Sequence, residues 1–307
     1  MPRVIVKYLC CVMKKVFPVY DICALSDHQH EDLLVSRFAP YLQKHQNLSL
    51  PHKHTFYHVV LFTQGSGTHS IDFKSFPVKP YQIYFMAPGQ VHRWNFEGPV
   101  DGYIINFSAS FFQSFLLRPD YLDSFAFFTG NIDDEVINLP QPIQATIVNL
   151  FEQLIQESAQ IHKMGMDIIR ALMLQLFILV ARESADSKLA TAPNYNYTLL
   201  QSFRKLTDMN FATLKLPKDY AALLYITPNH LNALCNDLLG ISAGEVIRNR
   251  VILEAKRLLV NVELTITAIA DKLNFTDNSY FTKFFKKYTG VTPEEFRKNT
   301  LSHDNIR

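Results

Sequence analysis

The sequence of 307 residues lacks most of the features that mark secreted, membrane-spanning or disordered proteins. Its four cysteines, Cys10, Cys11, Cys23 and Cys235, show no Cys-x-x-Cys spacing, which favours reduced thiols in a reducing compartment. No apolar run reaches the ~18 residues that a membrane-spanning helix needs. Charged residues make up 19% and hydrophobic residues 48%, which excludes a disordered or fibrous chain. We therefore expect a globular cytoplasmic protein with no membrane partner and no cofactor.

The N-terminus carries an apolar run but lacks the other parts of a signal peptide. Lys7 interrupts the run, and no small-residue cleavage site follows Lys14 and Lys15. We interpret residues 1–30 as an extension that precedes the first domain.

Positive charge is concentrated in the C-terminal third, although the whole chain carries a net charge of only +2. Residues 1–194 hold 15 Lys and Arg against 17 Asp and Glu, whereas residues 195–301 hold 14 against 10. A local positive excess favours contact with nucleic-acid phosphates. If the chain binds DNA, its binding surface is expected in this C-terminal part.

Short β-prone runs, separated by Gly, Pro and Asn, occupy residues 33–107 without intervening helices. The clearest are LLVSRF, FYHVVLFT, GTHSIDF, YQIYFMA and GYIINF. Regularly spaced short strands of this kind indicate an antiparallel sandwich or barrel. We predict an antiparallel β-barrel with a lined interior.

Histidine and aromatic side chains gather on one face of the predicted barrel. In an extended segment His52, His54, Phe56 and His58 share one parity and point to the same side. The pieces PHKHTFYHVV and APGQVHRWNF resemble the two cupin motifs, with His58 where metal-binding cupins usually carry Glu. The region is therefore expected to be cupin-like.

We expect this interior to bind a small-molecule effector. The side chains assigned to effector binding are His52, His54, Phe56, His58, His92 and Trp94. Imidazoles could also ligate a transition metal. Because motif matches alone over-predict such sites, we expect no metal here, and we interpret the other histidines, including His45 and His69, as surface or incidental.

The segment after the strands is predicted to alternate between helices and connectors. Residues 108–117 predict a short helix, and residues 120–142 a solvated connector with an acidic cluster at 133–135. Apolar stripes at helical spacing over 143–155 and 166–180 predict two long helices. We expect the second to pack on the barrel and hypothesise that the first offers a self-association face.

The predicted domains follow from these patterns. An effector-binding and dimerisation domain is expected over residues 31–183, and a linker rich in Ser, Ala and Pro over residues 184–196. An all-helical domain is expected over residues 197–300, with a tail at 301–307. The fold class is thus multidomain α+β.

Residues 267–297 predict a helix-turn-helix. Phe281, Phe284, Phe285 and Tyr288 form the i, i+3, i+4, i+7 stripe of a helix packed on one side. The opposite side is polar and basic, so it can bond base edges and neutralise phosphates.

A second copy of this pattern lies fifty residues earlier. Aligned pairs include Leu223 with Leu273, Tyr225 with Phe275, Leu231 with Phe281, and Gly240 with Gly290. Residues 245–260 between the copies predict one helix of roughly 25 Å. Two helix-turn-helix units joined by such a helix suit adjacent segments of the DNA major groove.

The C-terminal part, over residues 197–298, resembles the AraC/XylS family of bacterial transcription regulators. The resemblance is carried by Arg250, Ala255-Lys256, Leu258-Leu259, Ile269-Ala270, Phe275, Ser279-Tyr280-Phe281, Phe285-Lys286-Lys287, Gly290, Thr292-Pro293 and Arg297. It implies a domain of two helix-turn-helix motifs that binds promoter DNA and often contacts RNA polymerase. In such family members a cupin-like N-terminal domain senses a small molecule or mediates dimerisation.

The two units differ in the residues that would meet DNA. Candidate DNA-binding residues are Asn229, Asn232 and Asn236 in the first unit, and Asn278, Ser279, Thr282, Lys283, Lys286 and Lys287 in the second. The first unit has Ala233 where the family often has Arg, and Asp237 adds a repelling charge. We expect the second unit to supply more of the affinity.

We interpret the chain as a sequence-specific transcription regulator, an activator controlled by an effector in the barrel, and not as an enzyme. A homodimer is a further hypothesis. Two alternatives stay open, namely a metal-dependent cupin enzyme fused to a DNA-binding domain, and a constitutive DNA-binding protein whose barrel only dimerises.

Overall fold

The chain folds into two units, which are described separately below. In the computed structural model the first unit comprises residues 18–201 and the second begins at Ser202. The predicted linker 184–196 lies largely outside the described residues, as do most of the predicted extension and the end of the predicted tail. The described residues are 18–25, 32–113, 121–129, 132–159, 162–184, 195–261 and 263–303.

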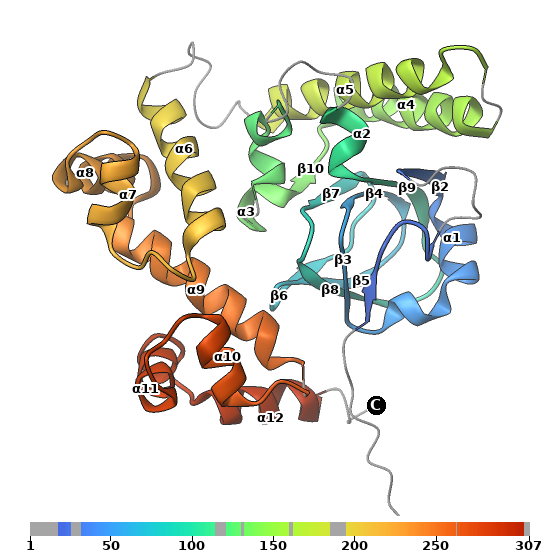
Figure 1. The fold of residues 1–307 in the computed structure, drawn as a ribbon. Helices are drawn as coiled ribbons and strands as arrows, with labels where there is room; N and C mark the ends of the chain where they lie inside the picture. The colour runs from blue at the N-terminus through green and yellow to red at the C-terminus, as the bar shows by residue number, and fades with distance from the viewer. Residues whose placement is uncertain are drawn as a thin grey trace, which may run out of the picture. The chain divides into compact units, whose positions relative to one another are not determined.

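The first unit contains two facing five-stranded sheets (Figure 1). The first sheet has the strand order β1 (Val19–Tyr20), β3 (His52–His54), β8 (Val91–Phe96), β5 (Gly67–Ile71), β6 (Lys74–Pro77). The second has the order β10 (Val136–Asn138), β7 (Gln82–Met86), β4 (Tyr57–Gln64), β9 (Asp101–Phe107), β2 (Leu33–Arg37). All five predicted strands are confirmed. Among the described strands no pairing joins the two sheets, so the predicted barrel is an open pair of sheets.

Part of the predicted N-terminal extension belongs to the fold. Strand β1 pairs in parallel with β3, and Ile22 and Leu25 are buried against the interior. The prediction that residues 1–30 precede the first domain is therefore wrong for residues 18–25. A two-residue strand carries no alternation pattern, which explains why the sequence did not reveal it.

Strand β4 lies between two cores because its side chains alternate. Val60 and Phe62 face the interior between the sheets, whereas Val59 and Leu61 face a second core with the helices. This second core is covered by α4 (Gln141–Ala159) and α5 (Gly165–Ser184), which lie side by side (Figure 1). The result is three layers, with the second sheet in the middle.

Both long helices bury their apolar stripes in this second core. On α5, Met173 and Phe177 are fully buried, as predicted. On α4, Ile147 and Phe151 are fully buried in the same cluster. The α4 stripe is therefore covered within this unit, and the hypothesis that α4 offers a self-association face stays a prediction.

The segment 120–142 is not a solvated connector where the structure describes it. It contains η2 (Tyr121–Ser124), η3 (Ala126–Phe128), α3 (Ile132–Glu135) and β10. Glu135 is fully buried, and Gln90 Nε2 donates to both of its carboxylate oxygens at 2.9 Å. The acidic cluster was misread because the amide that pairs with this carboxylate lies 45 residues away in the sequence.

Shorter helices complete the first unit. They are α1 (Phe38–Lys44), η1 (Gln46–Ser49) and α2 (Ala109–Gln113), of which the last confirms the described part of the predicted helix 108–117.

The described part of the second unit is helical, as predicted. Helix α6 (Tyr195–Asn210) crosses the boundary between the units at Ser202. The helices that follow it are α7 (Pro217–Leu223), α8 (Pro228–Leu239), α9 (Ala243–Leu259), α10 (Ile266–Lys272), α11 (Asn278–Thr289) and α12 (Pro293–His303). Helix α9 joins the two helix-turn-helix units, and α12 runs into the predicted tail. None of the described helices in either unit is long and apolar enough to cross a membrane.

Local caps fix the ends of the second helix in each helix-turn-helix. Asp277 accepts a hydrogen bond from the Tyr280 backbone at 2.7 Å at the start of α11, and Thr227 does the same for His230 at the start of α8. Each helix ends at a glycine with positive φ, 70° at Gly240 and 83° at Gly290.

Two cations tie the C-terminal helices together. Lys215 Nζ donates to the carbonyl oxygens of Leu273 and Asn274, at 2.7 and 2.8 Å, and lies 3.8 Å from the centre of the Phe275 ring. Arg297 donates to the carbonyl oxygens of Leu259 and Leu264, at 2.9 and 2.7 Å. The turn of the second helix-turn-helix and the end of α9 are thereby held by side chains distant in sequence.

The repeat has two registers. From the start of the second helix the offset is fifty residues, so Leu231 matches Phe281 and Gly240 matches Gly290. In the first helix and turn the offset is forty-nine, because equivalent hydrogen bonds run from Ile226 to Ala221 and from Phe275 to Ala270.

The predicted pairing of Leu223 with Leu273 and of Tyr225 with Phe275 is therefore wrong. Leu223 and Tyr225 are exposed, the latter at 96%. The turn of the first unit is one residue shorter than that of the second, a difference that alignment at one fixed offset hides. Tyr225 instead matches Asn274, and both have positive φ, 55° and 52°.

Asn274 is expected to be sensitive to a side chain that disfavours the left-handed region. We predict that Asn274→Ala lowers the free energy of unfolding of the second unit by about 1 kcal/mol, whereas Asn274→Gly changes it by less than about 0.5 kcal/mol. Denaturant unfolding followed by helical circular dichroism measures both. Equal effects of the two substitutions would contradict the role given to the positive φ.

Candidate nucleic-acid interface and effector site

The outer face of α11 presents polar and basic side chains. Asn278, Ser279, Lys283, Lys286 and Lys287 are exposed, and Thr282 is half-buried beside them. The opposite face is anchored in the core by Phe281 and Phe285. The N-terminal residues of such a helix are the ones that reach base edges in helix-turn-helix proteins. The six residues predicted to bind DNA in the second helix-turn-helix therefore lie on one accessible surface.

The corresponding face of α8 is weaker in charge. Asn229 and Asn236 are exposed, but Asn232 is half-buried, and its Oδ1 accepts a hydrogen bond from the Ala243 backbone at 3.1 Å. Asn232 thus supports the start of α9, which reduces its freedom to read a base. The exposed Asp237 adds negative charge at the position where the second helix-turn-helix has Lys287.

Between the two sheets of the first unit, five imidazoles meet. His52 and His54 on β3, His58 on β4, His69 on β5 and His92 on β8 are all at most 2% exposed. They meet because β3 pairs with β8 in a register that sets His52 opposite His92, and Ile71 of β5 lies opposite His92 on the other side. Phe56 and Trp94 are buried beside them.

All six residues predicted for effector binding therefore lie together, but inside the fold rather than at an open mouth. The sequence missed His69, which was interpreted as surface or incidental. His69 Nε2 lies 3.1 Å from His92 Nδ1. Its shared parity with the buried Ile71 was the available signal.

The hydrogen bonds assign protons to two of the imidazoles. His52 Nδ1 lies 2.8 Å from the Leu50 carbonyl oxygen, and His58 Nδ1 lies 2.6 Å from Asn106 Oδ1. Both partners accept, so each Nδ1 donates, and in a neutral ring the lone pair is then on Nε2. In both residues this Nε2 is buried and has no hydrogen-bond partner among the described residues.

Burial keeps the cluster neutral. Desolvation lowers the pKa of His52 to about 4 and that of His58 to about 3, despite hydrogen bonds that act in the opposite direction. Burial, reinforced by the neighbouring imidazoles, also holds the pKa of His54, His69 and His92 well below the usual value. At neutral pH each ring can therefore offer a lone pair.

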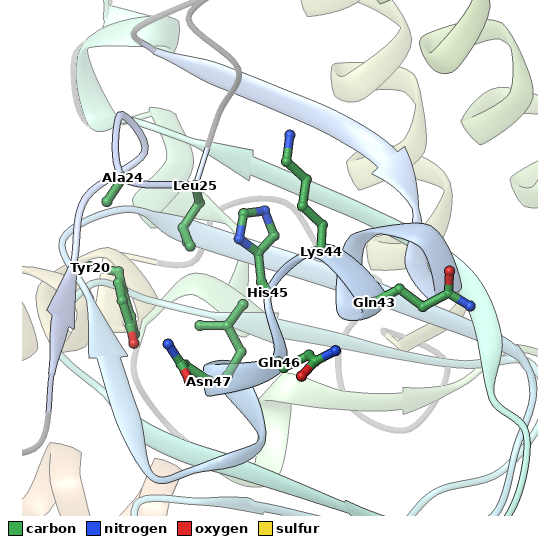
Figure 2. A pocket seen from close by; sticks show the side chains of 9 residues that line it. Tyr20, Ala24, Leu25, Gln43, Lys44, His45, Gln46 and Asn47 are labelled. Carbon is green, nitrogen blue, oxygen red and sulfur yellow. The ribbon is translucent and has the colours of Figure 1, made fainter.

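A pocket of about 380 Å³ lies beside Tyr20 and His45, two of the residues labelled in Figure 2. Its lining comes from the N-terminal segment and from the junction of α1 with η1, namely Tyr20, Ala24, Leu25, Gln43, Lys44, His45, Gln46, Asn47 and Leu48. This volume is within the range of small-molecule sites. None of the six residues predicted for effector binding belongs to the lining.

Two contacts join this pocket to the histidine cluster. The Tyr20 ring lies edge-on to His52, with ring centres 5.6 Å apart. On the other side the His45 ring lies 4.8 Å from the Tyr41 ring, and the Tyr41 hydroxyl accepts from Asn106 Nδ2 at 3.4 Å. Since Asn106 also bonds His58, the pocket is connected to the cluster directly through Tyr20 and indirectly through His45, Tyr41 and Asn106.

Comparison with known proteins gives two matching family models. A helix-turn-helix domain matches residues 220–299, and an AraC-like ligand binding domain matches residues 37–174. These matches fall on the two units that the structure separates.

Two named relatives align with most of the chain, and a third aligns with about a quarter of it. It is 21% identical over 288 residues to the HTH-type transcriptional activator RhaR of Mannheimia succiniciproducens, spanning 92% of this chain and 99% of that protein. It is 23% identical over 248 residues to the arabinose operon regulatory protein of Salmonella typhimurium, spanning 77% and 82%. The probable transcription factor PqrA of Proteus vulgaris is 37% identical over 75 residues, spanning 24% of this chain and 62% of that protein.

Asn106 is expected to stabilise the interior by satisfying His58. Asn106→Ala leaves the His58 Nδ1–H group buried without an acceptor, which should lower the free energy of unfolding of the first unit by about 2 kcal/mol. Tyr41→Phe removes only the long contact at 3.4 Å and should cost less than about 1 kcal/mol. Because Trp94 is the only tryptophan, its fluorescence during denaturant unfolding reports on this unit alone. A larger loss in Tyr41→Phe than in Asn106→Ala would refute the assignment.

Proposed function

The chain belongs to the AraC family of transcription regulators, and we propose that it is a sequence-specific activator whose second helix-turn-helix supplies most of its DNA affinity. The observation that carries the proposal is the pair of helices α8 and α11, which share one cap geometry but differ in charge. Exposed lysines occur on α11 where α8 carries Ala233 and Asp237.

The positions of the side chains along α11 suggest which of them contact bases and which contact phosphates. Asn278, Ser279 and Lys283 occupy its first two turns and are assigned to base edges. Thr282, Lys286 and Lys287 are assigned to phosphates, where they fix orientation without reading sequence. On α8 Asn229, Asn232 and Asn236 are assigned to the weaker, uncharged contacts.

We further propose that an effector occupies the pocket of Tyr20 and His45. The buried residues His52, His54, Phe56, His58, His92 and Trp94 then form the wall behind it and respond to the bound molecule through Tyr20 and Asn106. A constitutive DNA-binding protein would instead show no small molecule that changes both thermal stability and operator affinity.

The remaining elements of the proposal rest on the family. The named relatives are transcription regulators, which favours a regulator over a metal-dependent cupin enzyme. Contact with RNA polymerase, a homodimeric state and a cytoplasmic location are proposed on the same basis. Chromatographic mass at low and high concentration tests the dimer separately.

Selection of bound DNA from a random pool tests the base-reading role of Lys283. We expect the full chain to select one motif, and Lys283→Ala to relax the preference at one position by about 1–3 kcal/mol. Lys298→Ala, an exposed lysine on α12, serves as the control and should leave the motif unchanged. An unaltered motif in Lys283→Ala would exclude the assignment.

The salt dependence of binding tests the phosphate contacts. Each phosphate contact contributes about 0.9 to the slope of log K against log salt concentration. Replacing both Lys286 and Lys287 by Ala should therefore reduce the magnitude of the slope by about 2 and weaken binding to all sequences equally. If the slope is the same as in the unmodified protein, the two lysines only face solvent.

A further inference from the structure

The buried histidine cluster brings metal-ligating atoms within reach of one ion. One nitrogen each of His52, His54 and His92 lies within 4.8 Å of the other two, and all three residues are buried. Residues 52 and 54 share a side of β3, and His92 faces His52 across the β3–β8 pair. The backbone pairing of two strands therefore fixes this convergence, and loop geometry plays no part in it.

Buried lone pairs on two of the imidazoles indicate that the cluster binds a ligand and is more than a set of packed side chains. Within the described part of the chain the buried Nε2 atoms of His52 and His58 have no hydrogen-bond partner. A buried polar group without a partner costs about 1–3 kcal/mol of folding free energy. Each ring is oriented from behind, by the Leu50 carbonyl and by the Asn106 amide oxygen. A carbonyl or carboxylate oxygen behind the other ring nitrogen is the arrangement that orients histidines on metal ions.

The spacing of His54 and His92 fits one shared cation. Their Nε2 atoms lie 2.7 Å apart, so only one proton fits between them. Two imidazole nitrogens at about 2.0–2.1 Å from a tetrahedral ion lie about 3.3 Å apart. A shift of less than about 1 Å would therefore exchange the shared proton for a metal ion.

We propose that the interior of the first unit binds one divalent transition-metal ion through His52, His54 and His92, with His58 of the opposite sheet as the fourth nitrogen. A set of imidazoles without carboxylates suits zinc, copper or nickel and disfavours magnesium and calcium. The ion would join β3 and β8 of one sheet to β4 of the other. The ion would share these histidines with the wall behind the proposed effector pocket, but its binding requires neither an effector nor DNA.

Trp94 provides a built-in reporter for this site. Its ring centre lies 4.9 Å from that of His92, 5.8 Å from that of His52 and 5.7 Å from that of His58. As the only tryptophan of the chain, it is the only indole that a bound paramagnetic ion could quench.

The test uses the full chain without an affinity tag, stripped of metal by a chelator and titrated with cobalt(II). We expect Trp94 fluorescence to fall and to saturate at one equivalent at micromolar protein, and zinc to displace cobalt and restore it. X-ray absorption of the zinc-loaded protein should show nitrogen neighbours at about 2.0–2.1 Å and no sulfur at about 2.3 Å. A sulfur shell, or no saturable quenching, overturns the proposal.

Matched variants locate the ion. His52→Gln combined with His92→Gln should weaken cobalt binding by at least about a hundredfold, since two of the proposed ligands are lost. His162→Gln and His230→Gln, which change exposed histidines outside the cluster, should bind like the unmodified protein. Unchanged binding in the double variant overturns the assignment. If that variant does not fold, the single variant His58→Gln should still weaken cobalt binding, and unchanged binding there overturns His58 as a ligand. The X-ray absorption of the zinc-loaded unmodified protein then tests the nitrogen ligands without any substitution.

None of these readouts involves DNA. A failure here therefore leaves the proposed regulation of transcription untouched, and a failure of DNA binding leaves the metal site untouched.

Discussion

The alternation of side chains along a sheet that is buried on both faces is the constraint on which the first unit depends. Along β4 the residues of one parity, such as Val59, pack against α4 and α5, and those of the other parity, such as Val60, face the opposite sheet. A shift by one residue would exchange the two cores. The same parity draws His58 inward, so the histidine cluster is a consequence of register. Its polar atoms must then be satisfied inside, which is why Asn106 and the Leu50 carbonyl matter.

The second unit repeats the same helix-capping signals in its two helix-turn-helix motifs. A side-chain cap starts each second helix and a glycine with positive φ ends it, so α8 and α11 have equal lengths and equivalent buried faces. The surfaces are free to differ because the fold does not depend on them. On α11 they carry lysines, whereas on α8 Asn232 is partly committed to the start of α9. The duplicated fold therefore gives two binding surfaces of unequal strength, held together by α9, Lys215 and Arg297.

The sequence predicted what short-range periodicity determines. Helix α9, the faces of α11 and the inward parity of His52 and His54 all follow from spacing within a few residues. What failed depends on partners distant in sequence. Glu135 looked solvated because Gln90 was not visible as its partner, and β1 is too short to show a period. The Tyr20 pocket depends on the pairing of β1 with β3, which no local pattern supplies, whereas the parity of His69 with Ile71 was visible in the sequence.

The second helix-turn-helix is proposed to contribute more DNA affinity than the first, and this difference can be measured. It is tested most directly by dissociation constants of two full-length double variants on one selected DNA site. One variant combines Asn229→Ala with Asn236→Ala on α8, and the other combines Lys283→Ala with Lys286→Ala on α11. We expect the α11 variant to bind at least about tenfold more weakly than the α8 variant, since it loses a base contact and a phosphate contact. Equal losses, or a larger loss in the α8 variant, would contradict it.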